Sequence, residues 1–173
     1  MDNWLLKDSQ KDKQSITADW NIHGQQLIEG VVAHDIKNVV KNNGYLTEIY
    51  RREWLGADDD VDQIFQVVLH PGGISAWHTH EVTTDRLFVL TGTIKIVLYD
   101  GRQESPTYGM INEFRGSLLR PQLIVVPPKV WHGVQNIGPQ TAILLNIVDK
   151  AYQYEDPDHW RIAHTSAEIP YRF

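Results

Sequence analysis

The stretch that decides the fold reads Gly72-Gly-Ile-Ser-Ala-Trp-His78-Thr-His80-Glu-Val-Thr-Thr-Asp85-Arg-Leu-Phe-Val-Leu-Thr-Gly92. Side chains at i and i+2 of a β-strand point to the same face, so His78 and His80 can look into one cavity together. About fifty residues further on, the segment Pro127-Pro-Lys-Val-Trp-His132-Gly-Val-Gln-Asn136 carries another imidazole. We therefore expect Asp85 and His132, on later strands, to join the histidine pair.

Two kinds of chemistry fit such a cluster. Three imidazoles and one carboxylate are a suitable ligand set for a first-row divalent metal, and that set would be His78, His80, Asp85 and His132. The same groups could instead supply a general base inside a metal-free pocket. The residues alone leave both interpretations open.

The sequence pattern around this stretch is typical of an all-β protein. From Leu27 onward the chain consists of short runs rich in Val, Ile and Leu that end at Gly, Pro, Asn or Asp, a pattern typical of an antiparallel sandwich or barrel. Thr91-Gly92 predicts a tight hairpin turn and Asp100-Gly101 a second turn. The predicted strands are 27–33, 45–53, 63–69, 75–80, 86–90, 93–99, 123–126 and 142–148.

The length of 173 residues is that of one domain with a substantial core, and the hydrophobic content of 42% indicates a folded chain. We interpret residues 1–26, which are polar and irregular, as an N-terminal arm and residues 27–173 as a single barrel domain with a C-terminal tail. Asp58-Asp-Asp60 is expected to be an exposed loop, and calcium binding is not expected there because the spaced ligands of a calcium-binding loop are missing.

Composition also limits the partners. The formal net charge of −6 offers no basic face for nucleic acid and no polybasic membrane anchor. No run approaches the length of a membrane-spanning helix, and the first residues lack the features of a signal peptide. The chain has no cysteine, which suits a cytoplasmic protein and restricts any metal to nitrogen and oxygen ligands.

The two segments resemble the paired motifs of the cupin superfamily. Gly72, the His78-Thr-His80 pair, Asp85 and Gly92 fit the spacing of the first motif, with Asp in the place of its Glu. The second motif is matched by Pro127, His132 and Asn136, while Pro121 and Lys129 replace its two glycines. The resemblance implies a double-stranded β-helix, also called a jelly-roll barrel.

A narrower resemblance begins near Gly30 and covers most of the chain. The segments 43–48 and 105–109, the pair His132-Gly133 and the tail 152–161 look like those of the dTDP-4-dehydrorhamnose 3,5-epimerase family and of related dTDP-sugar ketoisomerases. These epimerases are metal-free cupins that act on a nucleotide-linked keto-sugar. The resemblance implies a small-molecule sugar nucleotide as partner, no cofactor, and a homodimer.

The resemblance also suggests site residues. His78 matches the family's base, so we predict His78 and His132 as catalytic residues. The predicted substrate-binding residues are Tyr45, Glu48, Arg52 and Trp77, although aromatic side chains more often fill core volume.

The match has gaps in the catalytic machinery. The family's catalytic Tyr falls near Asn146, the Asp that pairs with its base falls near His164, and the Arg of its nucleotide motif is Asn43. Tyr152 and Tyr154 are candidates for the missing general acid.

Three functions remain open at this stage. The first is an isomerase, a sugar-nucleotide epimerase or ketoisomerase that removes a proton next to a carbonyl of a dTDP-4-keto-6-deoxy sugar. The second is a metal-dependent oxygenase or isomerase that uses iron, manganese, nickel or zinc at the three-His, one-Asp site. The third is a non-catalytic cupin that binds a sugar or a small acid.

Overall fold

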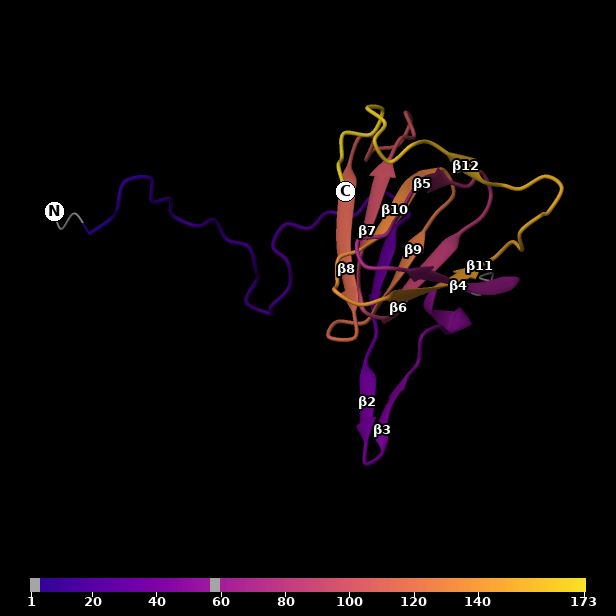
Figure 1. The fold of residues 1–173 in the computed structure, drawn as a ribbon, viewed down its shortest axis with the longest axis horizontal. Helices are drawn as coiled ribbons and strands as arrows, with labels where there is room; N and C mark the ends of the chain where they lie inside the picture. Colours follow the sequence, from indigo (N-terminus) through magenta and orange to yellow (C-terminus); the bar gives the residue numbers. More distant parts are fainter. Residues whose placement is uncertain (1–3, 57–59) are drawn as a thin grey trace.

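A computed structural model describes residues 4–56 and 60–173, and in it two five-stranded antiparallel sheets face each other (Figure 1). This confirms the predicted all-β, jelly-roll class. Among the described residues the helical structure is confined to one 3-10 turn, η1 (Arg52–Trp54). No helix in this described part is long and apolar enough to cross a membrane.

The strands of each sheet follow one another in an order far from the order of the sequence. The first sheet is ordered β1 (Val32–Asp35), β9 (Gln122–Val126), β6 (Asp85–Thr91), β11 (Ala142–Val148), β4 (Gln63–Leu69). The second is ordered β12 (Trp160–Arg161), β5 (Ile74–Thr79), β10 (Val130–Asn136), β7 (Thr93–Asp100), β8 (Ile111–Ser117). A separate hairpin is formed by β2 (Asn38–Lys41) and β3 (Gly44–Thr47).

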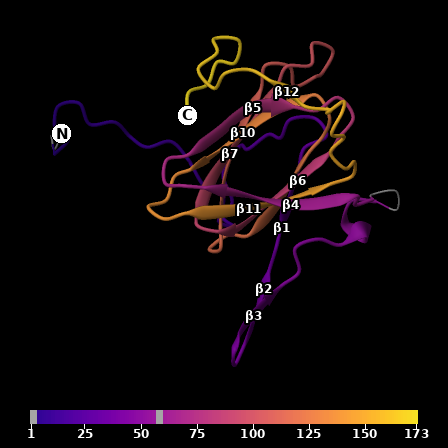
Figure 2. The ribbon, with the colours of Figure 1, turned by 45° about the vertical axis from the view of Figure 1, so that its right-hand side comes forward.

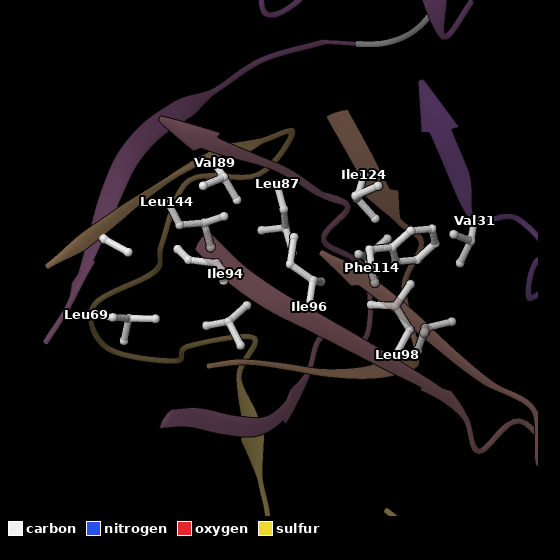
Figure 3. Packing of buried hydrophobic residues seen from close by; sticks show 14 of the residues in the cluster. Val31, Leu69, Leu87, Val89, Ile94, Ile96, Leu98, Phe114, Ile124 and Leu144 are labelled. Atoms are coloured by element: carbon white, nitrogen blue, oxygen red, sulfur yellow. The ribbon is translucent and has the colours of Figure 1, made fainter. Parts of the chain in front are cut away.

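The core lies between the two sheets and is built by the alternation of side chains along each strand. Ile94, Ile96 and Leu98 of β7 point inward, and they meet Leu87 and Leu144 of the first sheet (Figure 3). Burial of this apolar surface is the main force that holds the sheets together. The other end of the space between the sheets contains the polar site described below.

The prediction of a hairpin at Thr91-Gly92 is wrong, because the strands on either side do not pair with each other. β6 pairs with β9 and β11, whereas β7 pairs with β8 and β10. Gly92 is thus the corner where the chain crosses from one sheet to the other. Its φ is +77°, and a Cβ added there would lie 2.6 Å from the Cβ of Ala142, so both the conformation and the space favour glycine.

Two segments project from the barrel. The β2–β3 hairpin extends away from the sheets in both views (Figures 1 and 2), and Val39, Val40 and Leu46 on it are exposed. The N-terminal segment lies away from the barrel without a strand, held locally by an isolated bridge between Ile16 and Ile22, and reaches the barrel at Gln26, whose carbonyl accepts a hydrogen bond of 2.8 Å from Nδ2 of Asn112. Within the predicted Asp58–Asp60 loop only Asp60 belongs to the described residues.

Candidate active site

A cavity of about 330 Å³ opens between the sheets and is lined by side chains from both of them. The inward positions of β4 and β11 supply Phe65, Val67 and Leu144, which form apolar walls. His78, His80, Asp85 and His132 form its polar end. The structure therefore brings together the four residues that the sequence motifs single out.

The histidines meet because β5 and β10 are neighbours. His132 lies directly opposite His78 in the antiparallel register, and their ring centroids are 4.1 Å apart. His80, two residues after His78, lies just beyond the end of β5, with its ring centroid 5.6 Å from that of His132. Ligand-type atoms of the three imidazoles lie within 4.8 Å of one another.

Asp85 occupies the centre of the cluster. It is the first residue of β6 and is only 2% exposed. Its Oδ2 lies 3.2 Å from Nε2 of His80 and 3.1 Å from Nε2 of His132. Its Oδ1 accepts a hydrogen bond of 2.6 Å from Nδ2 of Asn146. Asn146, which stands near the position of the family's tyrosine, thus holds the carboxylate in place.

Backbone carbonyls fix the orientation of two of the rings. The Nδ1 of His80 bonds to the carbonyl of Asp158, and the Nδ1 of His132 lies 3.1 Å from the carbonyl of Val130. Since a carbonyl only accepts, each Nδ1 is the donor and each Nε2 is directed toward Asp85. Among the described residues, Oδ2 of Asp85 and Nε2 of His132 are buried without a properly aligned hydrogen bond. The space between these atoms thus suits a proton or a cation.

The electrostatics of the cluster follow from burial and charge. Burial is the largest single influence on the pKa of Asp85 and acts to raise it, but the charges and hydrogen bonds of His132 and His80 together outweigh burial and hold this pKa well below its usual value. Burial acts to lower the pKa of His80, but contact with the Asp85 carboxylate outweighs it and raises this pKa. Burial, reinforced by the charge of His132, lowers the pKa of His78 well below its usual value. His78 is therefore a neutral imidazole at the edge of an ionic cluster.

A fourth imidazole of the cavity, that of His159, was not predicted from the sequence. His159 lies with its ring centroid 5.1 Å from that of His78, and burial followed by the charge of Arg161 lowers its pKa to about 4. It reaches the site because β12 pairs with the edge of β5, so that Arg161 lies opposite His78. The only signal in the sequence was the family-like tail around it. His164, at the place of the family's aspartate, is absent from the cavity lining.

Several predicted substrate-binding residues lie elsewhere. Trp77 is fully buried on the outer face of its sheet, where it packs with Val97 and Ile169 and is absent from the cavity lining. Its placement is that of a core residue.

The other three belong to the region of the projecting hairpin. Tyr45 is 54% exposed on β3. Glu48 bonds to Arg51, with a distance of 2.8 Å from Nε, and Arg52 pairs with Asp60 at 3.2 Å. Within one chain, none of the three lines the histidine cavity.

A jelly-roll barrel whose open end holds a cluster of histidines around a carboxylate defines a cupin-type small-molecule enzyme. The model of the family described as dTDP-4-dehydrorhamnose 3,5-epimerase matches residues 25–172. The chain therefore belongs to this family, whose members are sugar-nucleotide epimerases, enzymes of the isomerase class that need no cofactor.

Individual relatives and solved structures agree with this family assignment. The probable low-salt glycan biosynthesis epimerase Agl13 of Haloferax volcanii is 33% identical over 138 residues, which are 79% of this chain and 88% of the relative. The crystal structure of a dTDP sugar isomerase from Desulfovibrio desulfuricans superposes with a TM-score of 0.77 at 25% identity, covering 83% of this chain and 90% of the other.

The 3'-monoepimerase ChmJ of Streptomyces bikiniensis, crystallised with dTDP-quinovose, has the same fold. Its TM-score is 0.74 at 19% identity, with 82% of this chain and 74% of the other covered.

Proposed function

We propose that this epimerase acts on a dTDP-4-keto-6-deoxy sugar and that His78 removes the proton on the carbon next to the carbonyl. The observation that carries the proposal is the convergence of His78 and His132 at the polar end of the cavity, in a chain of this family. The dTDP-sugar bound to ChmJ supports the class of substrate. The family match does not favour the two alternatives, a metal-dependent oxygenase or a non-catalytic binding protein.

The geometry suggests a division of roles. The carbonyl makes the neighbouring C–H bond acidic, and His78 accepts that proton while the electrons move into an enolate. His132, the second proposed catalytic residue, packs edge-on against the ring of His78, with 4.1 Å between the centroids. Positive charge on His80, whose pKa is raised by contact with Asp85, would stabilise the enolate at the polar end. Tyr152, which lines the cavity, is the proposed acid that returns a proton to the carbon.

Solvent exchange tests the base directly. In deuterium oxide the wild-type protein should incorporate deuterium next to the carbonyl of dTDP-4-keto-6-deoxyglucose, followed by NMR. The variant His78→Asn should lose exchange by about 100-fold or more, since general-base catalysis contributes about 10²–10⁴. His70→Asn, an exposed histidine outside the cavity lining, is the matched control. Full exchange in folded His78→Asn would reject His78 as the base.

A metal at the histidine cluster remains a separate proposal, supported by the donor geometry. The Nε2 atoms of His80 and His132 lie 3.2 and 3.1 Å from Oδ2 of Asp85, close to the about 3.0–3.4 Å between ligand atoms around an ion with bonds of about 2.1 Å. The Nδ1 atoms donate to backbone carbonyls, as is usual for metal-bound histidines. Iron, manganese, nickel or zinc would fit, with His78 as a further ligand, and a bound ion would polarise a substrate carbonyl.

Binding, rather than activity, tests this site. Protein purified without chelator is analysed for metal content, and chelated protein is titrated with cobalt(II), whose visible absorption reports the ligands. One ion per chain, lost in Asp85→Asn, supports the site. Metal-free protein that gives no cobalt spectrum, or the same spectrum in Asp85→Asn, rejects it.

We also propose that the chain forms a homodimer. The exposed apolar side chains of Val39, Val40 and Leu46 on the projecting hairpin support an interface there. A substrate-binding role for Tyr45, Glu48 and Arg52 would require a second copy of the chain, because they lie outside the cavity of their own. Light scattering of the wild-type protein and of Val40→Asp tests the dimer, and a monomeric wild type would reject it.

We further propose that residues 1–26 form an arm beside a barrel domain of residues 27–173, and that the protein is cytoplasmic.

A further inference from the structure

The cavity lining contains two cationic side chains outside the histidine cluster. Beyond the histidines, the cationic side chains that line the cavity are those of Lys150 and Arg161. Both belong to the segment 150–161, which connects β11 to β12 along the cavity and which we call the strap. The strap also contributes Tyr152, Gln153 and His159 to the lining.

Hydrogen bonds hold the strap at both ends, so the backbone that carries its two cationic residues has a defined position. At its start, the backbone N–H groups of Ala151 and Tyr152 donate to Asp62 and Gln63 over 2.9 and 3.0 Å. At its end, the carboxylate of Asp158 accepts the backbone N–H groups of residues 81–83 at 2.6 to 3.0 Å. Arg161 is then fixed by the pairing of β12 with β5.

The two cations are also available for a ligand. Other arginines of the described residues are engaged with carboxylates, and these are Arg51, Arg52, Arg102, Arg115 and Arg120. Within the same described ranges, the side chains of Lys150 and Arg161 make no hydrogen bond or ion pair. The nearby Asp158 does not compete for them, because backbone N–H groups already satisfy its carboxylate.

We propose that Lys150 and Arg161 form a clamp for the diphosphate of the nucleotide sugar, with the sugar ring deeper in the cavity beside His78. An arginine fork and a lysine ammonium are suited to phosphate oxygens. The clamp assigns this task to the C-terminal strap of the same chain. At the position of the arginine in the family's nucleotide motif, this sequence carries Asn43. The assignment rests on the proposed substrate class.

The test is calorimetric titration with dTDP, which separates binding from turnover. The wild-type chain should bind dTDP, and the double variant Lys150→Gln/Arg161→Gln should bind it about 100-fold more weakly, since each charge-assisted contact contributes about tenfold or more. Its affinity should also depend less steeply on salt. The control Lys11→Gln/Lys13→Gln makes the same change in net charge on exposed residues of the arm and should stay within about twofold.

Each other outcome overturns the clamp. Unchanged affinity in the double variant shows that dTDP binds elsewhere. An equal loss in the control pair shows an effect of net charge alone. A wild type that does not bind dTDP rejects both the clamp and the proposed nucleotide. By contrast, tight dTDP binding that depends on the clamp, together with no deuterium exchange into the keto-sugar, would overturn the proposed reaction and leave the clamp standing.

Discussion

The alternation of side chains along a strand predicts which individual residues face the cavity. His78 and His80 were expected to face one cavity because they are two positions apart, and they do. The same rule places Trp77, one position away, on the opposite face, where it is buried under the C-terminal segment. Trp77 was predicted to bind substrate because it is next to His78 in the sequence. The alternation of side chains along the strand instead places it on the opposite face.

Tyr152 is expected to be needed for reprotonation of the carbon and not for removal of its proton. In Tyr152→Phe, His78 should still remove the proton, so deuterium still enters the keto-sugar, while conversion to the epimer falls about 100-fold. Tyr154→Phe is the matched control, because its side chain is 87% exposed and absent from the cavity lining. The measurement is NMR of the exchanged substrate and of its epimer in one sample. Equal conversion by the two variants would remove Tyr152 from the mechanism.

Whole strands were predictable where the sequence is rich in branched apolar residues. β4 and β11 match their predicted ranges, because Ile, Val and Leu make up most of each strand. β8 was missed, since Ile111-Asn-Glu-Phe-Arg-Gly-Ser places polar groups among its apolar ones. The two-residue β12 carries no periodicity of its own and forms only because the edge of β5 is free to pair with it. His159, next to β12, could not be placed for the same reason.

The corner at Gly92 gives a prediction for the link between the sheets. Gly92→Ala combines a positive φ with overlap against Ala142, and it should lower the free energy of unfolding by about 3 kcal/mol. Gly72→Ala separates the two effects, because Gly72 has a φ of +73° and no atom within 4 Å of an added Cβ. It should cost about 1 kcal/mol. Urea unfolding measures both, and equal losses would contradict a steric role for Ala142.

At the scale of the whole molecule, the chain buries a charged network at the turn after β7 in addition to its apolar core. Asp100 is fully buried there, and Arg102, Ser105 and Thr107 donate to its carboxylate over 2.6 to 2.9 Å. Arg102 also donates to the backbone carbonyl of Glu29, which lies ahead of β1. The network therefore ties the start of the barrel to its middle. Asp100-Gly101 predicted a turn, but not the buried carboxylate, because its partners come together only in the folded chain.

Asp100 should make the protein sensitive to acid. Burial acts to raise its pKa, but the hydrogen bonds led by Arg102 outweigh it and hold this pKa well below the ordinary 3.8. A carboxylate with a lowered pKa stabilises the fold above its unfolded-state pKa, and this contribution disappears as the pH falls from about 4 toward the folded-state pKa. Asp100→Asn should be less stable at pH 7 by about 2–4 kcal/mol and should lose less stability on acidification.

Melting temperatures between pH 7 and pH 2.5 check this prediction. Glu104→Gln, an exposed carboxylate in the same turn, is the control and should follow the wild type. An acid slope in Asp100→Asn as steep as that of the wild type would show that other carboxylates govern acid unfolding.

The hydrogen bonds from the loop 81–83 to Asp158 predict a pattern of amide hydrogen exchange. The amide hydrogens of Glu81, Val82 and Thr83 are protected by a side chain from a distant part of the sequence, outside any sheet ladder. Their exchange with heavy water should therefore follow the detachment of the strap, while the amides of β6 and β10 follow the opening of the barrel. The exchange rates of these three amides therefore report whether the strap is attached and the cavity closed.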